Sequence, residues 1–174
     1  YLDQAIVWRD KDGDGAFTFV DANGDGMFQI GETVNDYYAI TDERGNFKSL
    51  GGTGAFHVFG GIDRYGTGLQ FEGVLLAPET AKVVTSLTTL VQALVEKGLS
   101  VTAADQKVRT ALQINGVSSL VGYDPLAAIN AGGTAASTAL SVQVKAVAVA
   151  NVLVAGAAAI LGNASSTSAT ATQD

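Results

Sequence analysis

The chain has 174 residues, 47% of them hydrophobic, which is enough for one or two small domains with packed cores. Its net charge of −7 argues against nucleic acid or an anionic membrane as a partner. Cysteine is absent, so disulfides and thiolate zinc sites are excluded. Residues 10–44 carry nine acidic and two basic side chains, so this window alone accounts for the net charge.

Two acidic loops lie end to end in residues 10–32, DKDGDGAFTFVDANGDGMFQIGE. Read from Asp21, the second loop has oxygen-bearing side chains at its first, third and fifth positions, a glycine at the sixth and Glu at the twelfth. This is the calcium-loop pattern of the EF-hand, in which alternate side chains turn inward toward a hard cation. The predicted ligands of this loop are Asp21, Asn23, Asp25, the carbonyl of Met27, and Glu32.

The first loop, read from Asp10, follows the same template with Asp10, Asp12, Asp14, the carbonyl of Ala16, and Asp21 as predicted ligands. Asp21 then closes one loop and opens the next, and it either bridges two ions or serves one of them. The first site is expected to be the weaker, because Asp is shorter than Glu. Asp-Gly clusters also form ordinary surface turns, but two templates in register favour Ca²⁺, with two ions per chain.

Calcium loops of modest affinity need the millimolar free calcium found outside cells, so secretion is expected. The chain begins at Tyr1 without Met, which indicates a mature or excised fragment whose leader or larger parent is missing.

The residues around the loops favour short β-strands over residues 1–78. Residues 1–9 alternate in a strand pattern, phenylalanines follow the loop glycines, and residues 33–50 have a hairpin signal around Asp42 to Gly45. Short strands separated by glycine turns predict an antiparallel β-sandwich of about six or seven strands. Helices that would flank the loops of a true EF-hand are not predicted, so a structural site is favoured over a calcium-triggered switch.

Residues 21–47 resemble the calcium-binding, prealbumin-like B-type modules of bacterial surface proteins. The match includes the acidic loop and a TD-x-x-G-x-F hairpin, here Thr41, Asp42, Gly45 and Phe47. This resemblance implies a calcium-binding sandwich over residues 1–78. The stretch from GGIDRYGTG to YDPLAAI is similar to segments of large secreted calcium-dependent adhesins of the repeats-in-toxin type, although the glycine-aspartate nonapeptides of that class are absent. Both resemblances imply an extracellular or cell-surface location in a bacterium.

After Pro78 the composition shifts to Ala, Leu and Val, which predicts a helical region over residues 79–162. Apolar residues in the 87–95 window fall on one helix face, and Gly98 ends that helix. The spacing of Thr102 and Asp105 resembles a capping box for a second helix through Leu112. Asp124 followed by Pro125 predicts the start of a third helix that stops at Gly132.

A long final helix is predicted from Thr134 to about Gly162, although alternating valines leave a β-strand possible. In residues 146–161 only Asn151 is polar, and this apolar run is too short for a comfortable membrane span, so no span is expected. The helix is either the central helix of a bundle or a subunit contact. The tail, residues 163–174, is expected to be flexible or glycosylated at Asn163.

Catalytic chemistry is not predicted. His57 lies in a strand-like apolar run, and the carboxylates of Asp63 and Glu72 lie on glycine-rich segments with nothing to place them across a cleft. The GGTG stretch at Gly51 lacks the remainder of a phosphate-binding loop. The chain is therefore expected not to be an enzyme.

The sequence as a whole predicts an α+β protein with an N-terminal antiparallel β-sandwich, EF-hand-like calcium loops and a C-terminal Ala/Val-rich helical region. The expected function is that of an extracellular, calcium-stabilised structural protein, a self-associating subunit or module of a surface layer, adhesin or filament. Its expected partners are copies of itself. One alternative is a calcium-dependent module that binds a glycan or another surface protein, with Trp8, Tyr37, Tyr38 and Tyr65 as candidate contacts. The other is an inert spacer domain of a giant surface protein.

Overall fold

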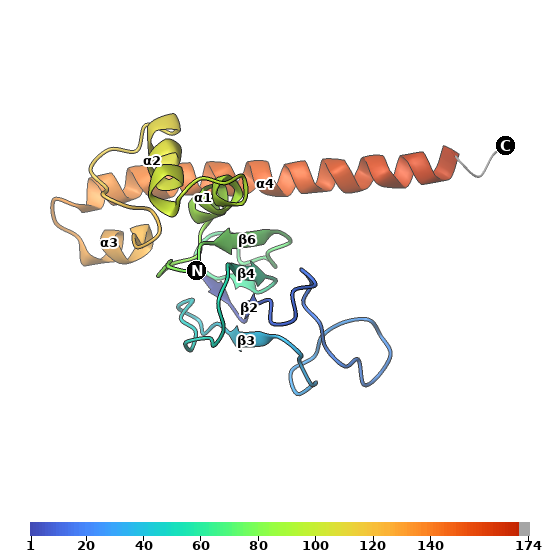
Figure 1. Ribbon diagram of the computed structural model, residues 1–174. Coiled ribbons are helices and arrows are strands. Elements are labelled where there is room, and N and C mark those ends of the chain that lie inside the picture. The colour runs from blue at the N-terminus through green and yellow to red at the C-terminus, as the bar shows by residue number, and fades with distance from the viewer. Residues whose placement is uncertain (171–174) are drawn as a thin grey trace.

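The computed structural model describes residues 1–170, with side chains through residue 159. A β-rich part and a helical part lie side by side, and the chain belongs to the mixed α+β class (Figure 1). Within the described residues the strands are β1 (Leu2–Asp3), β2 (Ile6–Arg9), β3 (Tyr37–Ile40), β4 (Phe56–Phe59), β5 (Ile62–Asp63) and β6 (Val74–Ala77). The helices are α1 (Ser86–Glu96), α2 (Val101–Ala111), α3 (Pro125–Ala131) and α4 (Ala136–Thr170).

Four strands form an antiparallel sheet in the order β3-β2-β4-β6, and β1 pairs with β5 in a separate two-stranded sheet. The predicted sandwich is not confirmed, because loop segments cover the faces of the larger sheet. Val7, Phe56 and Val58 on one face pack with Phe47 and Phe71 from the connecting loops. Much of residues 1–78 has the short apolar runs of strands but forms glycine-rich turns.

Helix α1 covers the β6 edge of the sheet. The Thr89 hydroxyl accepts a hydrogen bond from the Leu76 backbone N–H at 2.9 Å, and the Thr88 hydroxyl donates to the Leu76 carbonyl at 2.9 Å. These two bonds satisfy edge groups of β6 that would otherwise be open to another strand. The change of composition at Pro78 therefore coincides with the point where the chain leaves the sheet and begins the helical layer.

The helices pack around a core of their own, which contains Leu87, Val91, Val108, Leu120 and Val142. Two predicted helices are confirmed with their caps. Helix α1 is followed by Gly98 at a φ of +94°, and α3 begins with Asp124, whose side chain accepts from the Ala127 N–H.

The predicted capping box of the second helix is wrong. The N-cap of α2 is Ser100, whose hydroxyl accepts from the Ala103 N–H, and Asp105 is buried in the bundle. The Asp105 carboxylate accepts from the backbone N–H of Leu120 at 2.6 Å and from Arg109 at 2.7 Å. A partner fifteen residues away determines the position of Asp105, and local spacing does not contain that information.

The final segment is a helix and not the alternative strand, but α4 begins at Ala136 and extends past the predicted end at Gly162 to Thr170. Residues 163–170, predicted as flexible tail, continue the helix, and no proline interrupts it. The predictions for residues 171–174 and for the Asn163 side chain fall outside the described residues and side chains.

Helix α4 is not the central helix of the bundle. Ala139, Val142 and Ala146 are buried, whereas Val144 and Val152 are 61% and 71% exposed. Residues Ala136–Ala159 form a 24-residue segment whose most apolar 18-residue window has a mean hydropathy of 1.7 and is 11% buried, so the segment has the length and composition of a membrane span. This apolar segment is longer than the sixteen residues counted from the sequence, and the expectation of no membrane span stays a prediction.

Candidate metal centre

The two acidic loops have the same hydrogen-bond pattern, displaced by eleven residues. Asp10 accepts from the backbone N–H groups of Gly13 and Gly15 at 2.6 and 2.8 Å, and Asp21 accepts from those of Gly24 and Gly26 at 2.7 and 2.7 Å. Each first-position carboxylate therefore binds the backbone across its own loop. Each loop is a run of consecutive bends, over residues 11–16 and 22–27, and no helix adjoins either loop within the described residues, in contrast to an EF-hand.

The third and fifth positions repeat as well. Asp12 and Asn23 accept from the N–H two residues ahead, at 3.3 and 3.1 Å. Asp14 and Asp25 accept from the N–H groups of Ala16 and Met27, both at 2.8 Å. The third- and fifth-position side chains therefore bind the backbone of their own loop in both cases. Within the described residues, Asp10 and Asp12 are the predicted ligands that belong to a group of carboxylates within reach of one ion, and Asp14, Asp21, Asp25 and Glu32 belong to none. At the sixth position, Gly15 and Gly26 have φ angles of +76° and +75°, which other L-residues rarely adopt.

The second loop is closed by Glu32, as its position at the twelfth place predicts. The Glu32 carboxylate accepts from the N–H of Ala22 at 2.9 Å and from the N–H of Gln29 at 2.8 Å. The Gln29 side chain in turn donates to Asp25 at 2.6 Å. Glu32 therefore lies across the second loop from its first residue.

Asp36 is a candidate site residue that the sequence analysis did not include. Carboxylate oxygens of Asp10, Asp12 and Asp36 lie within 4.8 Å of one another. Asp36 is buried, and it accepts from the Lys11 N–H at 3.0 Å and from the Thr18 N–H at 2.8 Å. Within the described residues, Asp21 belongs to no such triad and is bonded to its own loop. The sequence did contain a signal for Asp36, because Asp36 directly precedes the strand β3. β3 pairs with β2, and the first loop begins where β2 ends.

The backbone donors also hold the first-position carboxylates in their ionised form. Hydrogen bonds from Gly13 and Gly15 lower the pKa of Asp10, and the bond from Gly26 is the main cause that lowers the pKa of Asp21. Ionised carboxylates with amide and carbonyl oxygens form the all-oxygen donor set that Ca²⁺ and Mg²⁺ prefer. The residues present therefore fit a hard divalent cation.

Aromatic side chains dock the loops on the sheet. Phe17, which follows the first loop, lies 5.8 Å from Trp8 and 5.4 Å from Phe59, measured between ring centroids. Phe28, which follows the second loop, lies 5.3 Å from Phe17 and 5.6 Å from Tyr38. The backbone at Phe19 also bridges to Val34. Both loops are therefore connected to the centre of the sheet through one cluster of rings.

The other residues considered in the sequence have structural surroundings. His57 is half-buried and its ring lies 4.4 Å from the Trp8 ring, and burial lowers the pKa of His57. Asp63 accepts from the N–H groups of a turn at Gly66 and Thr67. Four aromatic residues were considered as glycan contacts. Of these, Trp8 is buried, with 4% of its surface exposed.

Comparison of the chain with protein-family models, with curated proteins and with solved structures finds no match. The assignment of a function therefore depends on the geometry of the chain itself.

Proposed function

We propose that this chain is an extracellular, calcium-stabilised structural protein, a self-associating subunit or module of a bacterial surface layer, adhesin or filament. In this proposal each acidic loop binds one Ca²⁺ ion, and the ions stabilise the fold without taking part in a reaction. The observation that carries the proposal is the repeated loop pattern, in which Asp10 and Asp21 occupy equivalent positions with equivalent donors.

Calcium binding in the loops stabilises the sheet because the loops cover it. Without an ion, the carboxylates of each loop repel one another, and this repulsion opposes the docking of Phe17 and Phe28 on Trp8 and Tyr38. Binding to the folded form alone adds about 2.7 kcal/mol at a free calcium concentration 100 times the Kd. Millimolar calcium reaches that ratio for a Kd of about 10 μM, and for the weaker Kd of about 0.1–1 mM of extracellular modules it adds about 0.4–1.4 kcal/mol per ion.

Self-association in this proposal uses the β3 edge of the sheet. β3 is the terminal strand in the order β3-β2-β4-β6, whereas the opposite edge is covered by α1. Asp36, in the acidic triad, directly precedes β3, and Tyr38 of β3 contacts Phe28 after the second loop. Calcium binding therefore orders the segment that presents a free strand edge to a second copy, and strand addition is a common mode of such contacts.

Light scattering during a calcium titration of chelator-treated protein tests this function. The proposal predicts that the molar mass rises with calcium above its value in chelator, and that the melting temperature rises as well. The variants Asp25→Ala and Glu32→Ala, which change the second loop only, show smaller increases in both mass and melting temperature than the wild-type chain. The matched control is Glu43→Gln, which changes one exposed carboxylate outside the two loops. A mass that is the same at every calcium concentration would refute self-association through calcium, and an unchanged melting temperature would refute the calcium sites.

A further inference from the structure

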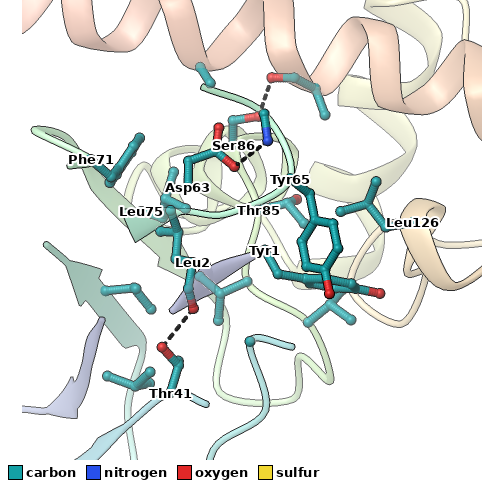
Figure 2. Close-up of a pocket in the computed structure, with 18 of the residues that line it drawn as sticks. Tyr1, Leu2, Thr41, Asp63, Tyr65, Phe71, Leu75, Thr85, Ser86 and Leu126 are labelled. Atoms are coloured by element: carbon teal, nitrogen blue, oxygen red, sulfur yellow. Dashed lines mark hydrogen bonds between the residues drawn. The ribbon is translucent and has the colours of Figure 1, made fainter. Parts of the chain in front are cut away.

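A groove with a volume of about 1930 Å³ runs along one face of the larger sheet, between the sheet, α3 and α4. Leu2, Phe71 and Leu75 form its wall on the sheet side, and Leu126 of α3 lies opposite (Figure 2). Its lining includes much of the hydrophobic cluster of the sheet, namely Leu2, Val7, Phe47, Phe56, Phe71 and Leu75. Small-ligand pockets are typically about 300–1,000 Å³, so this groove has room for a long apolar molecule.

Arg9 is the buried cation of this groove. It lies at the end of β2, two residues after Val7 and on the same face of the sheet, and it is 7% exposed. Its Nη1 donates to the Gly52 carbonyl at 2.8 Å, and its Nη2 donates to the Glu79 carbonyl at 3.1 Å. Its guanidinium carbon lies 3.9 Å from the centroid of the Phe56 ring. The charge of Arg9 is therefore held in a mostly apolar environment.

Neighbouring groups use only part of the binding capacity of Arg9. Among the residues whose side chains are described, the buried Nε–H has no acceptor, and no carboxylate forms an ion pair with the guanidinium. A guanidinium has five N–H donors, and two of those in Arg9 donate to carbonyls. Buried charges are usually paired, because removal from water is costly for a charge without a partner. Arg9 therefore favours an anion at its end of the groove. A carboxylate suits it best, because the planar guanidinium presents its donors in pairs that match two carboxylate oxygens.

The two ends of the groove differ in charge. Asp63 and Asp124 lie at the end where β5 pairs with β1, and there the Tyr1 hydroxyl donates to Asp124 at 2.9 Å. Arg9 lies at the opposite end of the sheet face, beside Phe56. The other charged residues of the groove, Arg44, Glu72 and Lys82, are exposed. The carboxylates at the far end repel a second negative group, so the groove favours a ligand with one anionic head and a neutral tail.

We propose that the groove binds a long-chain carboxylate, with its head group at Arg9 and its apolar tail against the hydrophobic cluster of the sheet. The head group accepts from the free N–H donors of Arg9 and neutralises the buried charge. The tail covers apolar wall residues such as Phe71 and Leu75. This site is separate from the acidic loops and from the β3 edge. It goes beyond the proposed function, and the two can fail separately.

Both parts of the ligand are needed to match the groove. A small inorganic anion satisfies Arg9 but leaves the apolar walls uncovered, and a neutral chain covers the walls but leaves Arg9 without an anion. A long-chain carboxylate satisfies both features.

Isothermal titration of the full chain in chelator tests the proposal, with dodecanoate and dodecyltrimethylammonium as probes below their micelle-forming concentrations. The two probes have the same alkyl chain and opposite head-group charges, and the chelator prevents precipitation of dodecanoate by calcium. The chain has a net charge of −7, so nonspecific attraction favours the cationic probe. The proposal predicts the reverse, with one dodecanoate bound per chain at least about 10-fold more tightly than the cation. Acetate, which has the head group without the tail, is expected not to bind measurably.

Arg9→Met is the variant that removes the head-group contact, and it keeps a long unbranched side chain. The matched control is Arg44→Met, which removes an exposed cation of the same groove. Arg9→Met is expected to bind dodecanoate about 10–100-fold more weakly than the wild-type chain, because it loses a charge-assisted contact. Arg44→Met is expected to bind it within about 3-fold of the wild-type chain, because exposed charges contribute little. Circular dichroism checks the fold of both variants. If Arg9→Met does not fold, the comparison of the probes on the wild-type chain decides.

Three results would overturn the proposal: no binding of dodecanoate, binding of the cationic probe as tight as that of dodecanoate, or equal binding of dodecanoate by the folded variants Arg9→Met and Arg44→Met. Dodecanoate binding that depends on Arg9, in a chain whose mass and melting temperature ignore calcium, would support this site and refute the proposed function. Assembly with calcium but without dodecanoate binding would do the reverse.

Discussion

Replacement of Asp36 by alanine separates the structural role of this carboxylate from its role toward an ion. Asp36 is 7% exposed and accepts from the backbone N–H groups of Lys11 and Thr18. A buried donor left without an acceptor costs about 1–3 kcal/mol. Two fully buried donors would cost about 2–6 kcal/mol. The bonds from Lys11 and Thr18 are part-buried and water replaces part of the lost acceptor, so the expected loss in the free energy of unfolding without calcium is about 2–4 kcal/mol. At about 2–4 °C per kcal/mol, the melting temperature falls by about 4–16 °C.

Asp36→Asn is the variant that addresses the ion. It keeps an acceptor oxygen at the same place but removes the charge, so it loses less stability in chelator than Asp36→Ala does. Its gain in melting temperature on addition of calcium is expected to be clearly smaller than that of the wild-type chain. Thermal unfolding followed by the fluorescence of Trp8, the single tryptophan, measures both quantities. Glu43→Gln is the control, with the same change of charge at an exposed position.

Two results would refute this reasoning. If Asp36→Ala changes the free energy of unfolding in chelator by less than about 0.5 kcal/mol, the hydrogen bonds to Asp36 do not organise the first loop. If Asp36→Asn retains the full calcium-dependent gain, Asp36 is not a ligand, and the first site is completed by another residue.

Three further predictions concern other parts of the chain. Asp105→Ala leaves buried donors without an acceptor and is expected to cost about 3–5 kcal/mol in urea unfolding, against a negligible loss for Gln106→Ala, an exposed neighbour. Thr89→Val removes the hydroxyl acceptor of the Leu76 N–H at the β6 edge and is expected to cost about 1–3 kcal/mol by the same measurement; an unchanged midpoint would contradict edge capping by α1. Because the pKa values of Asp10 and Asp21 are lowered in the folded protein, their contribution is present above the unfolded value of about 3.9 and is lost as pH falls through the lower folded values. Thermal unfolding of the chelator-treated protein against pH checks this, and a flat profile below pH 4 would contradict it.

The parts of the fold that the sequence predicted are those set by local chemistry. The apolar face of α1, the cap at Asp124 and the stop at Gly132 need only residues within one or two turns, and the structure has all three. The glycines at the sixth position of each loop and the closing Glu32 likewise act within their own loop.

The parts that failed depend on distant contacts. Asp105 follows Thr102 at the spacing of a capping box, but the N-cap is Ser100 and the actual partner of Asp105 is the backbone of Leu120. The sandwich was inferred from short apolar runs, but residues such as Phe47 and Phe71 cover the sheet from loops. Asp36 joins the first loop through strand pairing between β2 and β3. For α4, the Ala- and Val-rich composition and the start at Thr134 predicted the helix, but the extent of its burial depends on how far the bundle reaches along it.

Isothermal titration of calcium into chelator-treated protein tests the central claim most directly, because it counts ions without reference to assembly. The account predicts two binding events per chain, one of them lost in Glu32→Ala and the other weakened in Asp36→Asn. Titration without heat of binding at millimolar calcium, in a chain that remains folded by circular dichroism, would contradict the account and leave the two acidic loops as ordinary surface turns.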